Sequence, residues 1–217
     1  MFREVRRKNN KPGIYLISPA TINENFFFNK FKNLISSGLI DIFQLRVKNY
    51  SDREIIDYSK KLIPICKNYN VVFILNDRPD LAKLIEADGV HLGRQDMSIK
   101  DAREILGKQK IIGSSCYNNI NQSIKSEYLG ANYIAYGAFF KTETKENTTN
   151  INIYNIKKYK KNIKSPMVAI GGLNRFNIKK LSCLKPEFLA FCSAIWYNKM
   201  TPLEETNKIN NIINKTF

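Results

Sequence analysis

Short apolar runs alternate with segments of helical character along the chain. Eight runs rich in β-branched, aromatic and leucine side chains are each short enough to be one buried strand. They cover residues 13–18, 40–48, 71–75, 89–92, 111–115, 133–136, 166–170 and 188–192. Helices are expected at residues 25–37, 51–68, 79–86, 99–106, 119–129, 153–161 and 202–213.

Two of the expected helices begin at recognisable capping residues. Ser51 is followed three residues later by Glu54, which is the spacing of a capping box, and Ser98 precedes a helix expected to end at Gly107. Strict alternation of strand and helix predicts a parallel sheet, and eight such units predict a closed TIM-type (β/α)8 barrel. An open, doubly wound α/β sheet is the alternative fold.

In a parallel barrel the ends of the strands form one mouth, where active sites lie. Asp77 and Asp96 each follow one of two consecutive strands. Mg²⁺ usually binds through one or two carboxylates together with substrate phosphates. The two aspartates are therefore predicted to share Mg²⁺, although either one alone would more simply be a turn former or a helix cap.

Other polar residues at the strand ends suit an anionic ligand. Gln44, Arg46 and Lys48 share one face of a strand in a period-two pattern. Cations there would neutralise a leaving diphosphate, although they could instead pair with surface acids. The remaining polar or small residues at strand ends are Asn76, Ser115, Thr142, Thr144, Lys145, Gly171, Gly172, Cys192 and Ser193.

The last two strand ends predict a second anion site. Gly171 and Gly172 follow one strand, and Cys192 and Ser193 follow the next. Loops at these places are the usual phosphate cradle of this barrel, since glycine lets backbone N–H groups approach the ligand. Two anion sites at one mouth suggest two phosphorylated substrates.

His91, the only histidine, lies inside a strand and is interpreted as a hydrogen-bonded structural residue.

Composition and charge narrow the class of protein. No linker divides the chain, so residues 1–217 are expected to form one barrel domain with a basic leader at residues 1–12. The net charge of +16 favours anionic partners, but the lysines are spread over many segments, so nucleic-acid binding is disfavoured. The four cysteines lack CxxC spacing, and no run is long enough to cross a membrane. Without the apolar segment of a secretory signal, a cytoplasmic enzyme is expected.

Six motifs in order along the chain resemble the thiamine phosphate synthase family. They are QLRVK at residues 44–48, NDR at 76–78, ADGVHLG at 87–93 with Asp96, TETK at 142–145, AIGG at 169–172 and SAI at 193–195. The resemblance implies a transferase of thiamine biosynthesis. Such an enzyme joins 4-amino-5-hydroxymethyl-2-methylpyrimidine diphosphate to a thiazole phosphate and releases diphosphate.

The resemblance also implies a role for each matching residue. Asp77 and Asp96 would bind Mg²⁺. Arg46, Lys48, Ser115 and Lys145 would act in catalysis. The pyrimidine diphosphate would be held by Gln44, Arg46, Lys48, Asn76, Ser115 and Lys145, and the thiazole phosphate by Thr142, Thr144, Gly172, Cys192 and Ser193. The partners would be these small molecules, with no nucleic acid and no membrane, and a homo-oligomer stays open.

Two alternative functions stay open, one in a related enzyme and one in a different class of protein. A related thiazole tautomerase shares the barrel, but it depends on a histidine shortly after the fifth strand, where this chain has Cys116, Tyr117 and Asn118. A basic nucleic-acid-binding protein is suggested only by the net charge.

Overall fold

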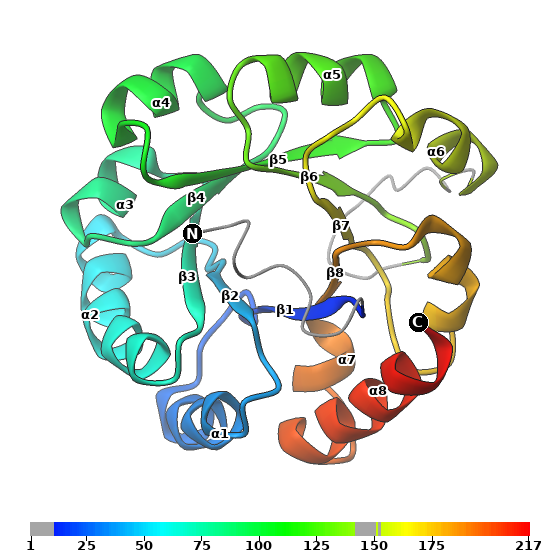
Figure 1. Cartoon of the computed structure of the whole chain (residues 1–217). Coiled ribbons are helices and arrows are strands. Elements are labelled where there is room, and N and C mark those ends of the chain that lie inside the picture. The colour runs from blue at the N-terminus through cyan, green and yellow to red at the C-terminus, as the bar shows by residue number, and fades with distance from the viewer. Residues whose placement is uncertain (1–10, 142–150, 152) are drawn as a thin grey trace.

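The computed structural model describes residues 11–141, 151 and 153–217. Its strands form a closed parallel barrel in the order β1-β2-β3-β4-β5-β6-β7-β8, with helices around the outside (Figure 1). The strands are β1 (Gly13–Ile17), β2 (Ile42–Leu45), β3 (Val72–Asn76), β4 (Gly89–Leu92), β5 (Ile111–Tyr117), β6 (Tyr133–Tyr136), β7 (Met167–Ala169) and β8 (Phe188–Phe191). The predicted (β/α)8 barrel is therefore confirmed.

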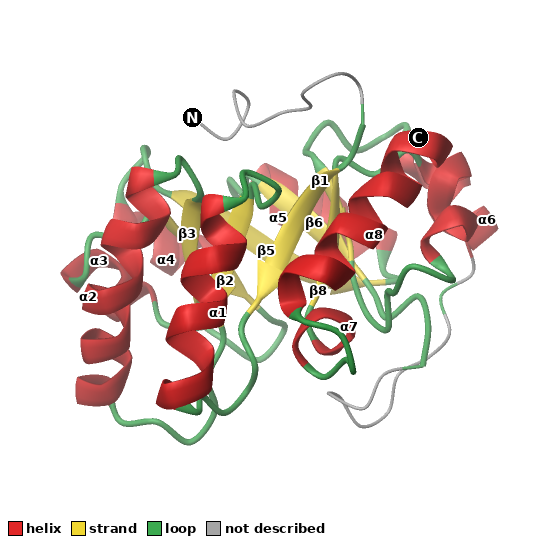
Figure 2. Cartoon of the chain, turned by 90° about the horizontal axis from the view of Figure 1, so that it is seen from below, coloured by secondary structure: helices red, strands yellow, loops and turns green. Residues whose placement is uncertain are grey.

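Seven helices lie close to their predicted positions. They are α1 (Glu24–Ser36), α2 (Asp52–Asn68), α3 (Pro79–Leu84), α4 (Ile99–Leu106), α5 (Ile120–Tyr128), α6 (Ile153–Lys160) and α8 (Pro202–Thr216). The described residues also form the short helix α7 (Ser193–Trp196) and the 3-10 helix η2 (Ile178–Leu184), for which no range was predicted. The capping box of Ser51 and Glu54 is present, and Ser98 accepts from the backbone N–H of Asp101. Figure 2 shows α7 at the end of the barrel opposite the C-terminus of α8.

Two predicted elements need correction, and the element between β7 and β8 was not predicted. The strand predicted at residues 40–48 ends at Leu45, so Arg46 and Lys48 lie in the loop that follows it. The helix predicted to end at residue 213 continues to Thr216. Between β7 and β8 the chain forms η2, a 3-10 helix for which no range was predicted.

Two apolar layers hold the barrel together. Inside the barrel, side chains such as Ile42, Ile74 and Phe188 form one buried cluster. Outside it, Phe43, Phe73 and their equivalents pack beneath the helices in a larger cluster. Alternation along each strand separates the two layers, as parallel barrels require.

At the end of the barrel opposite the mouth, four polar residues hold neighbouring strands together. Asp41, Asp88, Asn132 and Glu187 directly precede β2, β4, β6 and β8. The side chain of each accepts from a backbone N–H of the preceding strand, at 2.8, 2.8, 2.8 and 2.7 Å. The backbone N–H of each donates to the carbonyl of that same strand residue, at 3.0, 3.1, 2.7 and 3.0 Å. We call these four residues strand clasps; each joins two successive strands.

Candidate functional site

The mouth of the barrel, where the carboxyl ends of the strands emerge, gathers the predicted site residues that the structure describes. Gln44 on β2 is only 2% exposed although its side chain is polar. Its Nε2 atom donates to Oδ1 of Asn76 on β3 at 2.5 Å. Two residues predicted to hold the same substrate are therefore in direct contact.

An unbroken chain of hydrogen bonds continues from Gln44 through the barrel interior. The Tyr15 hydroxyl donates to Gln44 Oε1 at 3.1 Å and lies 2.8 Å from the Tyr133 hydroxyl. Tyr133 in turn lies 2.9 Å from Nδ1 of His91. Nε2 of His91 lies 2.8 Å from Oγ of Ser115, another predicted site residue. His91 thus links Ser115 to the interior, in addition to the structural role predicted for it.

A glycine makes room for this chain of hydrogen bonds. A Cβ atom at Gly113 would lie 1.9 Å from Cζ of Tyr133, so no other residue leaves space for that ring. The ring of His91 stacks on Tyr133 with centroids 5.6 Å apart and planes 19° apart. Burial raises the pKa of Tyr15 well above its usual value and also raises that of Tyr133. Both hydroxyls therefore keep their protons at physiological pH.

The loop after β1 organises the cationic side of the mouth. Ser18 is buried, and its Oγ accepts from the backbone N–H of Arg46 at 2.8 Å. The backbone N–H of Lys48 donates to the Ala20 carbonyl at 3.1 Å. Across the same loop, Sγ of Cys192 donates to the Ser18 carbonyl at 3.3 Å. Ser18, which was not predicted, therefore joins the predicted residues at the ends of β2 and β8.

The thiol of Cys192 is expected to react slowly. Burial raises its pKa to about 11, while the nearby Arg46 guanidinium acts to lower it. Because the thiolate is the reactive form, only about one molecule in a thousand is reactive at pH 8. Alkylation by iodoacetamide, followed by peptide mass spectrometry, should be much slower at Cys192 than at the exposed Cys183. Arg46→Gln should slow it further, and equal rates at the two cysteines would contradict this account.

The two predicted metal ligands follow neighbouring strands. Asp77 is exposed directly after β3, and Asp96 is half-buried after β4. These strands are paired, with Asn76 opposite His91, so both loops leave the same edge. No group of three or more His, Cys, Asp and Glu residues that could hold a metal occurs among the described residues. This donor set fits Mg²⁺, which needs only one or two carboxylates when phosphate oxygens complete its shell.

Each loop that carries an aspartate is anchored. The Asp77 backbone N–H donates to the His91 carbonyl at 2.8 Å, and the φ of Asp77 is 66°. Next to it, Arg78 donates two hydrogen bonds to Asp52, at 2.5 and 2.9 Å, and two to Asp80. The Arg78 guanidinium lowers the pKa of both carboxyl groups. The Asp96 carboxylate accepts from the Gly93 backbone N–H at 2.5 Å.

The glycine turn after β7 lies against the loop after β6. Gly171 and Gly172 have φ angles of 96° and 66°. A Cβ atom at Gly172 would lie 2.4 Å from the Lys141 carbonyl oxygen, and one at Gly171 would lie 2.4 Å from Ala138. The backbone N–H of Phe140 donates to the Gly171 carbonyl at 3.0 Å. Both the conformation and the close approach therefore require glycine.

The rest of the predicted second anion site is described only in part. Ser193 is half-buried and begins α7, directly after Cys192. Thr142, Thr144 and Lys145 lie outside the described residues.

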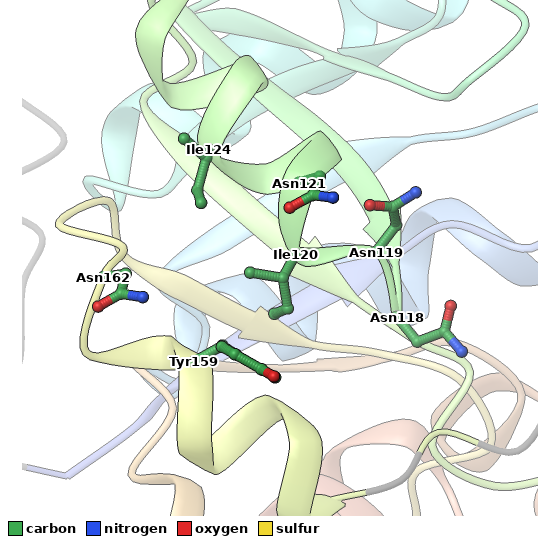
Figure 3. A pocket seen from close by; sticks show the side chains of 7 residues that line it. All are labelled: Asn118, Asn119, Ile120, Asn121, Ile124, Tyr159 and Asn162. Atoms are coloured by element: carbon green, nitrogen blue, oxygen red, sulfur yellow. The ribbon is translucent and has the colours of Figure 1, made fainter.

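A hollow on the outer surface does not suit the predicted substrates. It has a volume of about 590 Å³ and lies between α5 and α6 (Figure 3). The described residues that line it are Asn118, Asn119, Ile120, Asn121, Ile124, Tyr159 and Asn162. None of these seven is charged, so they cannot neutralise a phosphate. The mouth is therefore the candidate active site.

Sequence reasoning missed three features of this site. Tyr15 and Tyr133 look like ordinary core residues because each lies in a run predicted to be a buried strand. Ser18 gives no signal beyond its position before Pro19. The Arg78 clamp has a faint signal, since an arginine directly follows Asp77 and an acid begins the preceding helix.

The fold and the site together define a class of protein. A closed (β/α)8 barrel with amide, hydroxyl and charged groups at the mouth is an enzyme of the TIM-barrel class.

Comparison with known proteins gives the family. The family described as "Thiamine monophosphate synthase" matches residues 14–195. The thiamine-phosphate synthase of Pelagibacter ubique is 42% identical over 94% of this chain and 99% of its own. That of Fusobacterium nucleatum is 42% identical over 76% of this chain and 80% of its own. The solved thiamine phosphate pyrophosphorylase from Pyrococcus furiosus is 28% identical, with a TM-score of 0.84 over 96% of this chain and 98% of its own.

This chain therefore belongs to the thiamine monophosphate synthase family, and it is a transferase enzyme, as its motifs predicted. Among the helices of the described residues, none is long and apolar enough to span a membrane.

Proposed function

We propose that this protein condenses 4-amino-5-hydroxymethyl-2-methylpyrimidine diphosphate with a thiazole phosphate, giving thiamine phosphate and diphosphate. The observation that carries the proposal is the grouping of four residues at the carboxyl ends of β2, β3 and β5. Gln44 bonds to Asn76, Arg46 follows in the next loop, and Ser115 is linked to Gln44 through the interior chain. Together with Lys48, they are the described residues that the resemblance to the family assigns to the pyrimidine diphosphate.

The reaction breaks one bond and forms one. The C–O bond between the pyrimidine methylene and the diphosphate breaks first, and its electron pair leaves on the diphosphate oxygen. The lone pair of the thiazole nitrogen then forms a C–N bond to the methylene carbon of the resulting cation. No strong base is needed, so the site must position the reactants and neutralise the leaving group.

The residues of the mouth suit these two tasks. Gln44 and Asn76 would hold the pyrimidine diphosphate in place, while Arg46 and Lys48 would neutralise its phosphate oxygens. Ser115 would hydrogen-bond the same substrate, and Lys145 would add a cation from the loop after β6. Because the Ser18 loop binds the backbone of Arg46, that cation is supported from two strands.

Asp77 and Asp96 would hold Mg²⁺ at the edge formed by β3 and β4. The bound metal would supply positive charge to the departing diphosphate. The clamp formed by Arg78 would keep the Asp77 turn in place during turnover, since Arg78 bonds to both α2 and α3.

The thiazole phosphate would bind at the ends of β7 and β8. The Gly171-Gly172 turn exposes backbone close to the loop after β6, and the Cys192-Ser193 turn follows on the neighbouring strand. Thr142 and Thr144 would complete this subsite.

Incubation with the two substrates and Mg²⁺ tests the proposal directly. We expect thiamine phosphate and diphosphate in equal amounts, measured by chromatography and a coupled phosphate assay. Omission of either substrate is the control. If saturating substrates give neither product, the proposed function is wrong, and conversion of the thiazole alone would instead favour the tautomerase alternative.

A further inference from the structure

The interior hydrogen-bond chain takes one side chain from each of six consecutive strands. Along the chain the order is Ser115, His91, Tyr133, Tyr15, Gln44 and Asn76, which come from β5, β4, β6, β1, β2 and β3 (Figure 1). The proposed function gives Ser115 and Asn76, at the two ends, and Gln44 contacts with substrate. The other three members, His91, Tyr133 and Tyr15, are buried, and the proposed function gives them no contact with substrate.

Once donor and acceptor are fixed in one of these hydrogen bonds, they are fixed in all the others. A tyrosine hydroxyl has a single proton, and a neutral imidazole has one donor and one acceptor nitrogen. Because Tyr15 donates to Gln44, Tyr133 must donate to Tyr15, and Nδ1–H of His91 must donate to Tyr133. The Ser115 hydroxyl then donates to Nε2 of a neutral His91. In this direction Ser115 can only accept a hydrogen bond from a ligand.

A rotation of the two amide groups by half a turn reverses every bond. The Asn76 amide nitrogen would then donate to Gln44, Gln44 to Tyr15, Tyr15 to Tyr133, and Tyr133 to His91. His91 would donate to Ser115, which frees the serine proton for a ligand and frees Oδ1 of Asn76 to accept. The shape of the site stays the same, because the oxygen and nitrogen of each amide exchange places and His91 changes from its Nδ1–H to its Nε2–H tautomer.

We propose that Tyr15, Tyr133 and His91 are positioning residues that couple the hydrogen-bond state of Ser115 to that of Asn76. A substrate oxygen that accepts from Ser115 selects the direction in which Asn76 accepts from the substrate. The site thereby recognises an acceptor at one end and a donor at the other as a pair. The inference rests on the proposed function, which gives both ends their substrate.

A double-mutant cycle measures this coupling. The affinity for the pyrimidine diphosphate with Mg²⁺, in the absence of thiazole, is measured by calorimetry for the native protein, Ser115→Ala, Asn76→Ala and the double variant. Ser115 and Asn76 lie on strands that are not neighbours, β5 and β3, so they can couple through the interior chain or through the shared substrate, and the backgrounds described next separate these two routes. We expect the combined loss in affinity to differ from the product of the single losses by about threefold or more.

The same cycle in a Tyr133→Phe background removes one link and keeps the ring. There we expect the combined loss to return to the product of the single losses. Tyr15→Phe breaks the chain at another link and should have the same effect, which keeps the test valid if Tyr133→Phe does not fold. The matched control is Tyr136→Phe, a buried tyrosine of the same strand that packs in the outer layer beneath the helices. It should leave the coupling unchanged.

The outcomes separate this inference from the proposed function. If the native protein does not bind the pyrimidine diphosphate at all, both are wrong. If it binds, but the coupling is absent or is the same in the Tyr133→Phe and Tyr15→Phe backgrounds, only the inference is wrong. Coupling that disappears in these two backgrounds and persists in Tyr136→Phe supports it, since a general loss of stability would not distinguish these buried tyrosines.

Discussion

Replacement of Asp77 or Asp96 by asparagine is expected to reduce Mg²⁺-dependent turnover by about 100-fold or more. An asparagine keeps the size of the side chain but removes the negative charge that would hold the metal. The fold should survive both changes. The Asp77 turn is held through its backbone N–H, and an asparagine at position 96 can still accept from the Gly93 N–H through its amide oxygen.

The measurement is the rate of product formation over a range of Mg²⁺ concentrations. Asp57→Asn is a matched control, because Asp57 is an exposed aspartate on α2 that lies 4.0 Å from Arg53 of the same helix. It should retain the native rate and the native Mg²⁺ dependence. Full activity of both Asp77→Asn and Asp96→Asn, with unchanged Mg²⁺ dependence, would disprove the metal assignment.

Gly172→Ala is expected to weaken binding of the thiazole phosphate selectively. The new Cβ would lie 2.4 Å from the Lys141 carbonyl and 2.8 Å from that of Phe140, so the loop after β6 must move. Each hydrogen bond to a charged group contributes about 1.5–3 kcal/mol, so loss of one raises KM for the thiazole phosphate by roughly 10- to 100-fold. KM for the pyrimidine diphosphate should change little.

Gly38→Ala is the control for backbone strain. Gly38 has a φ of 71°, close to the 66° of Gly172, but a Cβ there would meet nothing within 4 Å. Its KM values should match those of the native protein even if its melting temperature falls. Equal changes in both KM values for Gly172→Ala would show that the turn does not belong to the thiazole end alone.

The barrel could be predicted from the sequence because its signals are local. Capping residues such as Ser51 and Ser98 fix where helices begin, and each apolar run fixes a strand. The end of β2 could not be predicted in this way. Val47 continues the alternating pattern, but β1 ends at Ile17, opposite Gln44, and the Arg46 N–H bonds to a serine side chain instead of a strand. Pairing with a neighbour therefore overrides the local preference.

The site, like the fold, could be predicted only where its signals are local in the sequence. Strand ends can be identified in a sequence, so Gln44, Asn76 and Ser115 could be assigned to one mouth. Their connection could not, because it depends on which interior side chains lie at the same height in the closed barrel. That height follows from the stagger of all eight strands, which is a property of the whole sheet. Tyr15 and Tyr133, on β1 and β6, meet only once the barrel is closed.

The strand clasps divide the barrel into four units, each made of an odd-numbered strand, its helix and the next strand. The two ends of the described chain also meet, since Nζ of Lys11 donates to Asn214 at 3.1 Å. A circular permutant that joins these ends and opens the chain at the exposed turn Tyr69-Asn70 would keep every clasp within one continuous segment. Opening it between Glu86 and Asp88 would instead separate a clasp from the strand it closes. New termini should therefore be tolerated best between the clasped units, as at Tyr69-Asn70, and worst within one of them.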